Sequence, residues 1–149
     1  MPNQEQLTLI APCGLYCGNC PLFLARTDES LRQKLAEGQG IPIEQVRVCA
    51  GCRPMQGRAP FTIGGNACDN YICAIESKKV KYCYECQDFP CLKLAPCSDR
   101  ASEIPHNTKI YNLLLLKKEG ADSLIQNDRN RRRQYFRGKK PKAGSDIQI

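Results

Sequence analysis

Apolar residues recur at helical spacing in two parts of this chain, one before residue 40 and one after residue 107. In the first part, Leu24, Leu31 and Leu35 are separated by seven and four residues, which is the repeat of one face of an α-helix. Pro21 suits the first turn of such a helix, and Gly38 and Gly40 mark its end. The pattern predicts a helix over residues 21–37, with an interruption near residues 27–28.

The second helical pattern starts after Asn107, which can cap a helix, and stops at Gly120. A last helix is expected from Ala121, with Leu124 and Ile125 facing inward, and it becomes increasingly polar toward its end. The inward positions of the earlier helix are aliphatic: Ile110, Leu113, Leu114 and Leu116.

The remaining segments carry weaker signals. Residues 7–10 form a short apolar lead-in that we expect to be extended, and residues 41–46 predict a short helical turn. Glycine and proline predict a loop over residues 53–67, and residues 68–97 read as turns without a periodic pattern. From residue 138 on, the composition predicts disorder.

Eleven cysteines interrupt this framework in closely spaced groups. Two thiolates two to four residues apart can converge on one metal ion, while the intervening turn directs backbone N–H groups toward the sulfur atoms. The spacing therefore predicts metal coordination. The groups are Cys13-x3-Cys17-x2-Cys20, Cys49-x2-Cys52, Cys68-x4-Cys73, Cys83-x2-Cys86-x4-Cys91 and a trailing Cys97.

Disulfide bridges are the main alternative, because chains dense in cysteine are often secreted scaffolds. An odd number of cysteines would leave one thiol unpaired, and no signal peptide is visible at the start of the sequence. Cysteines as close as those in C-x2-C also bridge poorly to each other. We therefore expect reduced, metal-bound thiols in a cytoplasmic protein.

The amino-acid composition indicates a small apolar core, and this favours a structural role for the metal. The apolar fraction of 42% includes the cysteines, and the chain has no tryptophan and only four phenylalanines. A structural zinc site contributes about 10–16 kcal/mol of apparent binding free energy, against a typical net stability of about 5–15 kcal/mol. We expect the metals to be what allows residues 10–97 to fold. No apolar stretch approaches the length of a membrane span, so no membrane partner is expected.

The net charge of +7 lies entirely at the C-terminal end. Residues 1–128 hold 14 basic and 14 acidic residues, whereas residues 129–149 hold eight basic residues and one acidic residue. This division predicts a metal-binding domain over residues 1–128 and a basic, partly disordered tail over residues 129–149.

The cations of residues 129–142, with Tyr135 and Phe136 among them, could bind nucleic acid or another acidic partner. The alternative is a solvated, solubilising terminus. Binding through the tail predicts salt-sensitive retention on heparin or RNA that disappears on deletion of residues 129–149.

The cysteine groups, taken in order, closely resemble a bacterial and archaeal family known only as domain of unknown function 3795. The resemblance spans about residues 10–125 and includes the segments 13–23, 68–75 and 83–94. It implies a small zinc-binding domain without an assigned activity. It also implies ten metal ligands, namely Cys13, Cys17, Cys20, Cys49, Cys52, Cys68, Cys73, Cys83, Cys86 and Cys91.

Counting the ligands leaves the number of ions open. Ten thiolates make two four-thiolate sites with two thiolates left over, whereas eleven thiolates and the sole histidine, His106, match three tetrahedral sites. Cys97 lies outside the family pattern, and His106 reads more simply as a surface residue beside a helix cap. We expect two or three Zn²⁺ ions.

The same thiols also suit other chemistry. The first group has the spacing that radical S-adenosylmethionine enzymes use for a [4Fe–4S] cluster, but those enzymes need a partial α/β barrel that this pattern does not predict. An Fe–S redox protein is the stronger alternative, because thiolates hold iron–sulfur clusters as well as zinc. A redox dithiol at Cys83 and Cys86 is disfavoured because Cys91 follows so closely. Nothing marks a catalytic residue.

The sequence thus predicts a small cysteine-rich domain of α-helices and irregular segments, organised by metal sites, with zinc knuckles between short helices and few or no strands. We expect structural four-thiolate zinc sites in a protein that is non-enzymatic or of unassigned activity, and that acts as a binding or adaptor module. An Fe–S redox protein is the first alternative, and a nucleic-acid-binding zinc protein that acts through the basic tail is the second.

Overall fold

A computed structural model describes residues 1–60, 62, 65–94 and 108–137 of the chain. These residues form α-helices and short 3-10 turns joined by irregular segments, and no strand occurs among them apart from a single bridge between Ile10 and Tyr16. The expected helical and irregular class with few or no strands is confirmed. Cys97, His106, Asn107 and the segment expected to be disordered from residue 138 lie outside the described residues.

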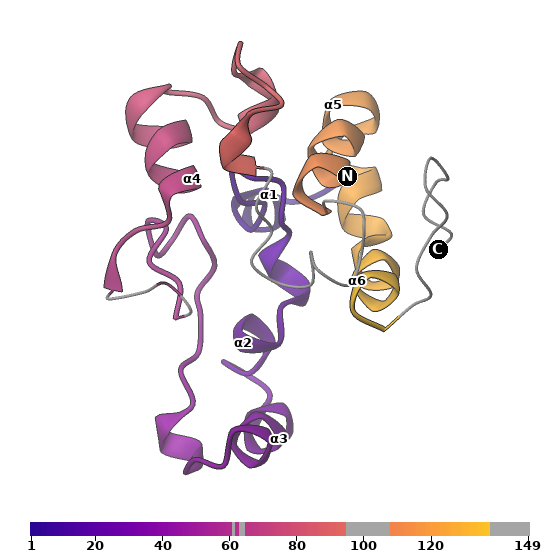
Figure 1. Cartoon of the computed structure of the whole chain (residues 1–149). Helices are drawn as coiled ribbons and strands as arrows, with labels where there is room; N and C mark the ends of the chain where they lie inside the picture. The colour runs from indigo at the N-terminus through magenta and orange to yellow at the C-terminus, as the bar shows by residue number, and fades with distance from the viewer. Residues whose placement is uncertain (61, 63–64, 95–107, 138–149) are drawn as a thin grey trace.

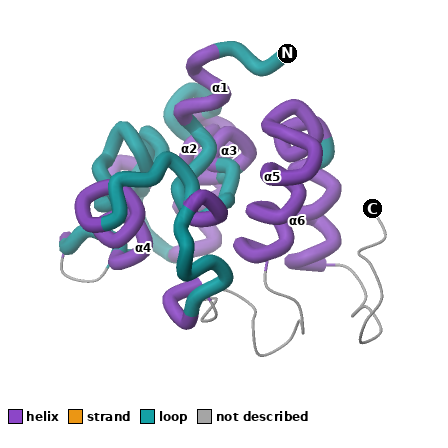
Figure 2. The backbone as a smooth tube through the Cα atoms, turned by 90° about the horizontal axis from the view of Figure 1, so that it is seen from above, coloured by secondary structure: helices purple, strands orange, loops and turns teal. Residues whose placement is uncertain are grey.

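The segment that carries α1 to α3 lies between α4 on one side and the paired α5 and α6 on the other (Figures 1 and 2). None of the described helices is both long and apolar enough to cross a membrane.

Helix α1 (Gln4–Thr8) replaces the extended lead-in expected over residues 7–10, so that prediction was wrong for residues 7 and 8. The physical reason is a capping box. The side chain of Asn3 accepts a hydrogen bond from the backbone N–H of Gln6, and the Gln6 side chain accepts one from the backbone N–H of Asn3. These two bonds satisfy amide donors that a helix start leaves unpaired, and so favour a short helix over a strand.

Helices α2 (Pro21–Leu24) and α3 (Glu29–Gln39) confirm the helix predicted over residues 21–37 and its interruption. Asp28 ends the interruption by accepting a hydrogen bond from the backbone N–H of Leu31, which makes it the N-cap of α3. Gly40 ends α3 in the left-handed conformation. The short turn expected near residue 43 is the 3-10 helix η2 (Ile43–Gln45).

The segment expected to be turns throughout contains one helix that the sequence pattern did not indicate. Helix α4 (Asp69–Tyr71) continues as a π-helical turn, η4 (Ile72–Ser77). It presents Ala74 to the interior but has few other buried apolar residues, which explains the lack of a clear repeat. The 3-10 turns η5 (Cys83–Glu85) and η6 (Leu92–Leu94) follow it.

Helix α5 (Thr108–Gln126) carries the leucines predicted to face inward, and Leu113 and Leu116 are buried, whereas Leu114 is exposed. Gly120 breaks α5 at the expected place, because its φ of 84° is left-handed. One last helix was expected from Ala121. Instead, a new helix, α6 (Asp128–Arg137), begins after Asn127.

The core forms where residues 9–16 meet α5 and the start of η5. Gly14, with a φ of +88°, lies so close to α5 that an added Cβ would stand 2.8 Å from Cγ of Leu113 and 3.1 Å from the carbonyl oxygen of Lys109. Asn112 fixes the same contact by donating a hydrogen bond from Nδ2 to the carbonyl oxygen of Gly14 (3.0 Å). The buried cluster consists of Leu9, Ile10, Ala11, Cys13, Tyr16, Tyr82, Leu94, Leu113, Leu116 and Leu124.

We expect Gly14→Ala to destabilise the protein by about 2 kcal/mol or more, because the backbone there is left-handed and the new methyl group would press on α5. Gly38→Ala is the matched control. Gly38 lies inside α3 with open space around its Cα, so alanine should be neutral or stabilise by about 0.5–1 kcal/mol. Urea unfolding of both variants measures the difference, and equal stabilities would contradict the close approach of Gly14 to α5.

Candidate functional site

The first and last cysteine groups share one local structure. Cys17 opens the 3-10 turn η1 (Cys17–Asn19), and the backbone N–H of Cys20 donates to the carbonyl oxygen of Cys17 (3.0 Å). Cys83 opens η5 in the same way, and the backbone N–H of Cys86 donates to the carbonyl oxygen of Cys83 (3.1 Å). Each C-x2-C pair is therefore folded back so that both cysteines flank one tight turn.

Backbone hydrogen bonds bring cysteines from distant parts of the sequence together. The N–H of Cys83 donates to the carbonyl oxygen of Pro12 (2.9 Å), next to Cys13. The N–H of Cys49 donates to the carbonyl oxygen of Leu22 (3.0 Å), close to Cys20. All four cysteine groups are thereby gathered around residues 9–22, because Cys68 in turn donates to the loop that follows Cys52, at the carbonyl oxygen of Gly57 (3.0 Å).

Arg53 joins three of these segments. It follows Cys52, its Nε donates to the carbonyl oxygen of Ile10 (2.8 Å), and its Nη2 donates to the carbonyl oxygen of Lys81 (2.5 Å). Its guanidinium also lies over the ring of Tyr82, 5.2 Å from the centroid. The segments that contain Cys13, Cys52 and Cys83 are thus held to one another by a single side chain.

Backbone N–H groups are directed at several sulfur atoms. The Sγ of Cys17 accepts from the N–H of Cys52 (3.4 Å), and the Sγ of Cys49 accepts from the N–H of Gly51 (3.4 Å). The thiol of Cys13 accepts from the backbone of Leu15. Such donors stabilise a thiolate more than a neutral thiol, because the hydrogen bond is stronger when the acceptor carries charge.

The ten described cysteines divide into two sets, according to which thiols raise the pKa of Cys13, Cys17, Cys49, Cys52 and Cys83. The first thiol cluster combines the first three cysteine groups up to Cys68, and the second thiol cluster combines Cys73 with the last group. Cys13 links the two, because its charge would also raise the pKa of Cys83. The first cluster holds Cys13, Cys17, Cys20, Cys49, Cys52 and Cys68, and the second holds Cys73, Cys83, Cys86 and Cys91.

Burial makes these thiols hard to ionise one at a time. It raises the pKa of Cys17 to about 11 and that of Cys83 to about 12, and it also raises the pKa of Cys52. Neighbouring thiols act in the same direction, because each thiolate would repel the next. A set of thiols this close can release several protons together only if a positive charge is placed among them.

All ten described cysteines are free thiols. In the described part of the chain, no group of three or more histidine, cysteine, aspartate or glutamate side chains is arranged so that it could hold a metal ion. The structure therefore brings the predicted ligands into two neighbourhoods without assembling them into a coordination shell. The predicted set of ten ligands stays a prediction.

Two residues near the thiols were not anticipated from the sequence. The Sδ of Met55 lies 3.4 Å from the Sγ of Cys49 and accepts a hydrogen bond from the N–H of Ala50 (3.3 Å). Asn19, inside the Cys17–Cys20 turn, binds α6 by donating from Nδ2 to Oδ2 of Asp128 (2.9 Å) and by accepting from Nε of Arg129 (3.0 Å). The only sequence signal for Asn19 was its place between two cysteines.

A comparison with protein families matches residues 9–96 to the family described as "Protein of unknown function (DUF3795)". The chain belongs to the DUF3795 family. The match covers all four cysteine groups of the two thiol clusters and ends before α5. No curated protein and no solved structure matches the chain. For this DUF3795 protein, the thiol clusters therefore lie within the part of the chain that the family shares.

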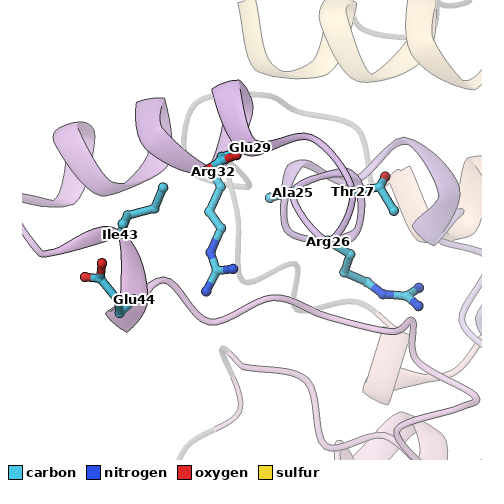
Figure 3. Close-up of a pocket in the computed structure, with 7 residues that line it drawn as sticks. All are labelled: Ala25, Arg26, Thr27, Glu29, Arg32, Ile43 and Glu44. Atoms are coloured by element: carbon cyan, nitrogen blue, oxygen red, sulfur yellow. The ribbon is translucent and has the colours of Figure 1, made fainter.

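A separate cavity of about 450 Å³ lies between α3 and η2 (Figure 3). Arg32 extends from α3 into it, whereas Arg26 points away (Figure 3). The lining contains two arginines, two glutamates and no cysteine, so its positive and negative charges balance and favour no class of ligand. The lining residues are Ala25, Arg26, Thr27, Glu29, Arg32, Ile43 and Glu44.

The start of α6 is held by a buried ionic network. Asp128 and Arg131 are 2% and 3% exposed, with Oδ1 and Nη2 4.0 Å apart, and Arg131 also donates to the carbonyl oxygen of Leu124. We expect Asp128→Asn to destabilise the protein by about 3 kcal/mol, because it leaves the Arg131 charge buried without its counter-charge.

The matched control for that substitution is Asp122→Asn. The side chain of Asp122 is 60% exposed and lies 3.6 Å from the N-terminal amine, so its replacement should change the free energy of unfolding by less than about 1 kcal/mol. Urea unfolding at neutral pH compares the two variants. Equal changes in the free energy of unfolding would show that the buried charge of Arg131 does not need the charge of Asp128.

Proposed function

We propose that this DUF3795 protein is a metal–thiolate protein in which zinc ions hold the two thiol clusters together. The observation that carries the proposal is the gathering of ten cysteines, from four segments separated by up to 78 residues, into two adjacent clusters. Apolar packing alone gives no reason to bring cysteines from four segments into two neighbourhoods, because cysteine contributes little more than a small apolar side chain to a core.

The chemistry of the donor set supports zinc. Zinc prefers thiolate sulfur, and its structural sites take four ligands. The second thiol cluster supplies one such set, Cys73, Cys83, Cys86 and Cys91, and the first supplies another with two thiols to spare. The N–H donors at Cys13, Cys17 and Cys49 would take up part of the negative charge of the bound thiolates.

A structural role follows from the thinness of the apolar core. In the described part of the chain, the largest fully buried apolar side chains are four leucine or isoleucine residues and a proline. A four-thiolate shell leaves no open coordination position for a substrate, so such sites stabilise a fold rather than catalyse a reaction. We infer that the zinc-bound domain serves as a scaffold for binding a partner.

Iron–sulfur chemistry is the competing assignment for the same thiols, because clusters are also held by four cysteines. Elemental analysis and a visible spectrum of protein purified without oxygen distinguish the zinc assignment from the iron–sulfur assignment. We expect two or three zinc atoms per chain and a colourless solution. A brown protein that contains iron and sulfide would replace the zinc assignment.

We expect Cys83→Ser to bind about one zinc ion fewer per chain and to lower the melting temperature by roughly 10 °C or more, since the second thiol cluster then lacks one of its four ligands. Cys97→Ser is the control for the two-ion form, because Cys97 lies beyond the matched residues 9–96 and would be a ligand only of a third ion. Metal content and melting temperature are measured for both. Unchanged zinc and unchanged melting in Cys83→Ser would refute a ligand role for Cys83.

We also expect zinc affinity to rise with pH. Burial raises the pKa of Cys17 and Cys83 well above 7, so their thiols are protonated at neutral pH and each must release a proton to bind zinc. A four-thiolate site should release about four protons per ion, and acid should weaken binding accordingly. Zinc titration in weakly buffered solution, with a pH indicator, counts these protons. Release of fewer than about two protons per ion would exclude a site built from thiols.

A further inference from the structure

A second surface of the molecule has the features of a binding site and contains no thiol. It is an open groove of about 630 Å³ between α2 and α6. One wall consists of four arginines on α6, and the other is formed by Asn19, Pro21 and Leu24. We call it the arginine groove, and its four cations are Arg129, Arg132, Arg133 and Arg137.

The charge of the arginine groove is not offset by acidic groups in its lining. The lining includes no aspartate or glutamate, although α6 begins with Asp128. Asp128 is 2% exposed and turned toward Asn19 and Arg131, and its charge also attracts Arg132, so this one carboxylate offsets only part of the charge of the four arginines. The groove therefore presents an excess of positive charge to solvent.

The spacing of the four arginines suits a chain of anions. They occupy positions i, i+3, i+4 and i+8 of one helix, so the first and last lie about 12 Å apart along its axis. Successive phosphates of one strand are about 3.4 Å apart along a duplex axis and farther apart in an extended strand, so the row can contact two or more of them. Guanidinium groups bind phosphate through paired hydrogen bonds, which a lysine ammonium cannot do.

The opposite wall supplies apolar surface. Pro21 is exposed and Leu24 is half-buried, and both line the groove beside the aliphatic stems of the arginines. A duplex would offer this surface only phosphates and base edges. A single strand can place the faces of its unpaired bases against it while its phosphates meet the guanidinium groups.

We propose that the arginine groove binds single-stranded nucleic acid by its phosphate backbone, with the unpaired bases against Pro21 and Leu24. The groove has a fixed position because Asn19 bonds to both Asp128 and Arg129, which holds α6 against the Cys17–Cys20 turn. Three further lysines follow in the sequence, at positions 139, 140 and 142.

The structure also decides how the proposal is tested. Deleting residues 129–149 would remove Arg131, which is 3% exposed and part of the interior, so weaker binding could reflect unfolding. Substituting Arg133 and Arg137 avoids this, because both are exposed on α6. The matched control is Arg47→Gln with Arg58→Gln, which removes two exposed arginines from outside the groove.

The experiment measures fluorescence anisotropy of labelled oligo(dT) and oligo(U) of about 12 nucleotides, and of a duplex of the same length, with full-length protein in reducing buffer. We expect Arg133→Gln with Arg137→Gln to weaken binding to the single strands at least about fivefold. It should also reduce the slope of log affinity against log salt by about 1.4, which is about 0.7 for each phosphate that is no longer neutralised. The control pair should change affinity less than about twofold, and the duplex should bind more weakly than the single strands.

Several results would overturn the proposal. The first is the absence of binding of the intact protein to either oligonucleotide at about 50 mM salt. Equal weakening by the two arginine pairs would show that only net charge matters. Equal or tighter binding of the duplex would contradict the role given to the bases. Displacement of the oligonucleotides by poly-glutamate at matched charge would point to an acidic protein partner instead.

Discussion

The burial of residues 9–17 at the centre of the molecule is the constraint on which the rest of the structure depends. The backbone of this segment pairs with itself only in part, as in the bridge between Ile10 and Tyr16, so other parts of the chain must supply the remaining partners. Arg53 donates to the carbonyl oxygen of Ile10, Asn112 donates to that of Gly14, and Cys83 donates to that of Pro12. The loop after Cys52, the helix α5 and the turn η5 are each positioned by one of these bonds.

The same bonds determine which thiols become neighbours. Residues 9–17 carry Cys13 and Cys17. The cysteine-bearing segments that form hydrogen bonds with this backbone therefore place their own thiols near these two cysteines. The resulting proximity is unfavourable for thiolates by themselves, since burial and mutual repulsion raise the pKa of Cys17, Cys52 and Cys83. A bound divalent cation would instead favour the thiolates, because its positive charge offsets their repulsion and the cost of their burial. In the proposed zinc form, the segments that satisfy the central backbone also supply the ligands.

The two proposed sites meet at Asn19. It lies in the Cys17–Cys20 turn on one side and bonds to Asp128 and Arg129 on the other. A change in the conformation of the turn would therefore move the α6 wall of the arginine groove. In the proposed metal-bound form, this arrangement holds a binding surface in a fixed position.

The sequence by itself determined the elements whose signals are local. The helices at 21–39 with their break, the end marked by Gly120, and the spacing of the cysteine groups all follow from nearby residues and their caps. Only the tertiary structure decided which groups are neighbours, that Arg53 and Asn112 bind the central backbone, and that Arg131 is buried while Arg133 is exposed. The physical reason is that these contacts join residues 28 to 110 positions apart, or depend on which face of α6 packs inward. A one-dimensional pattern of polar and apolar residues carries no information on such pairings.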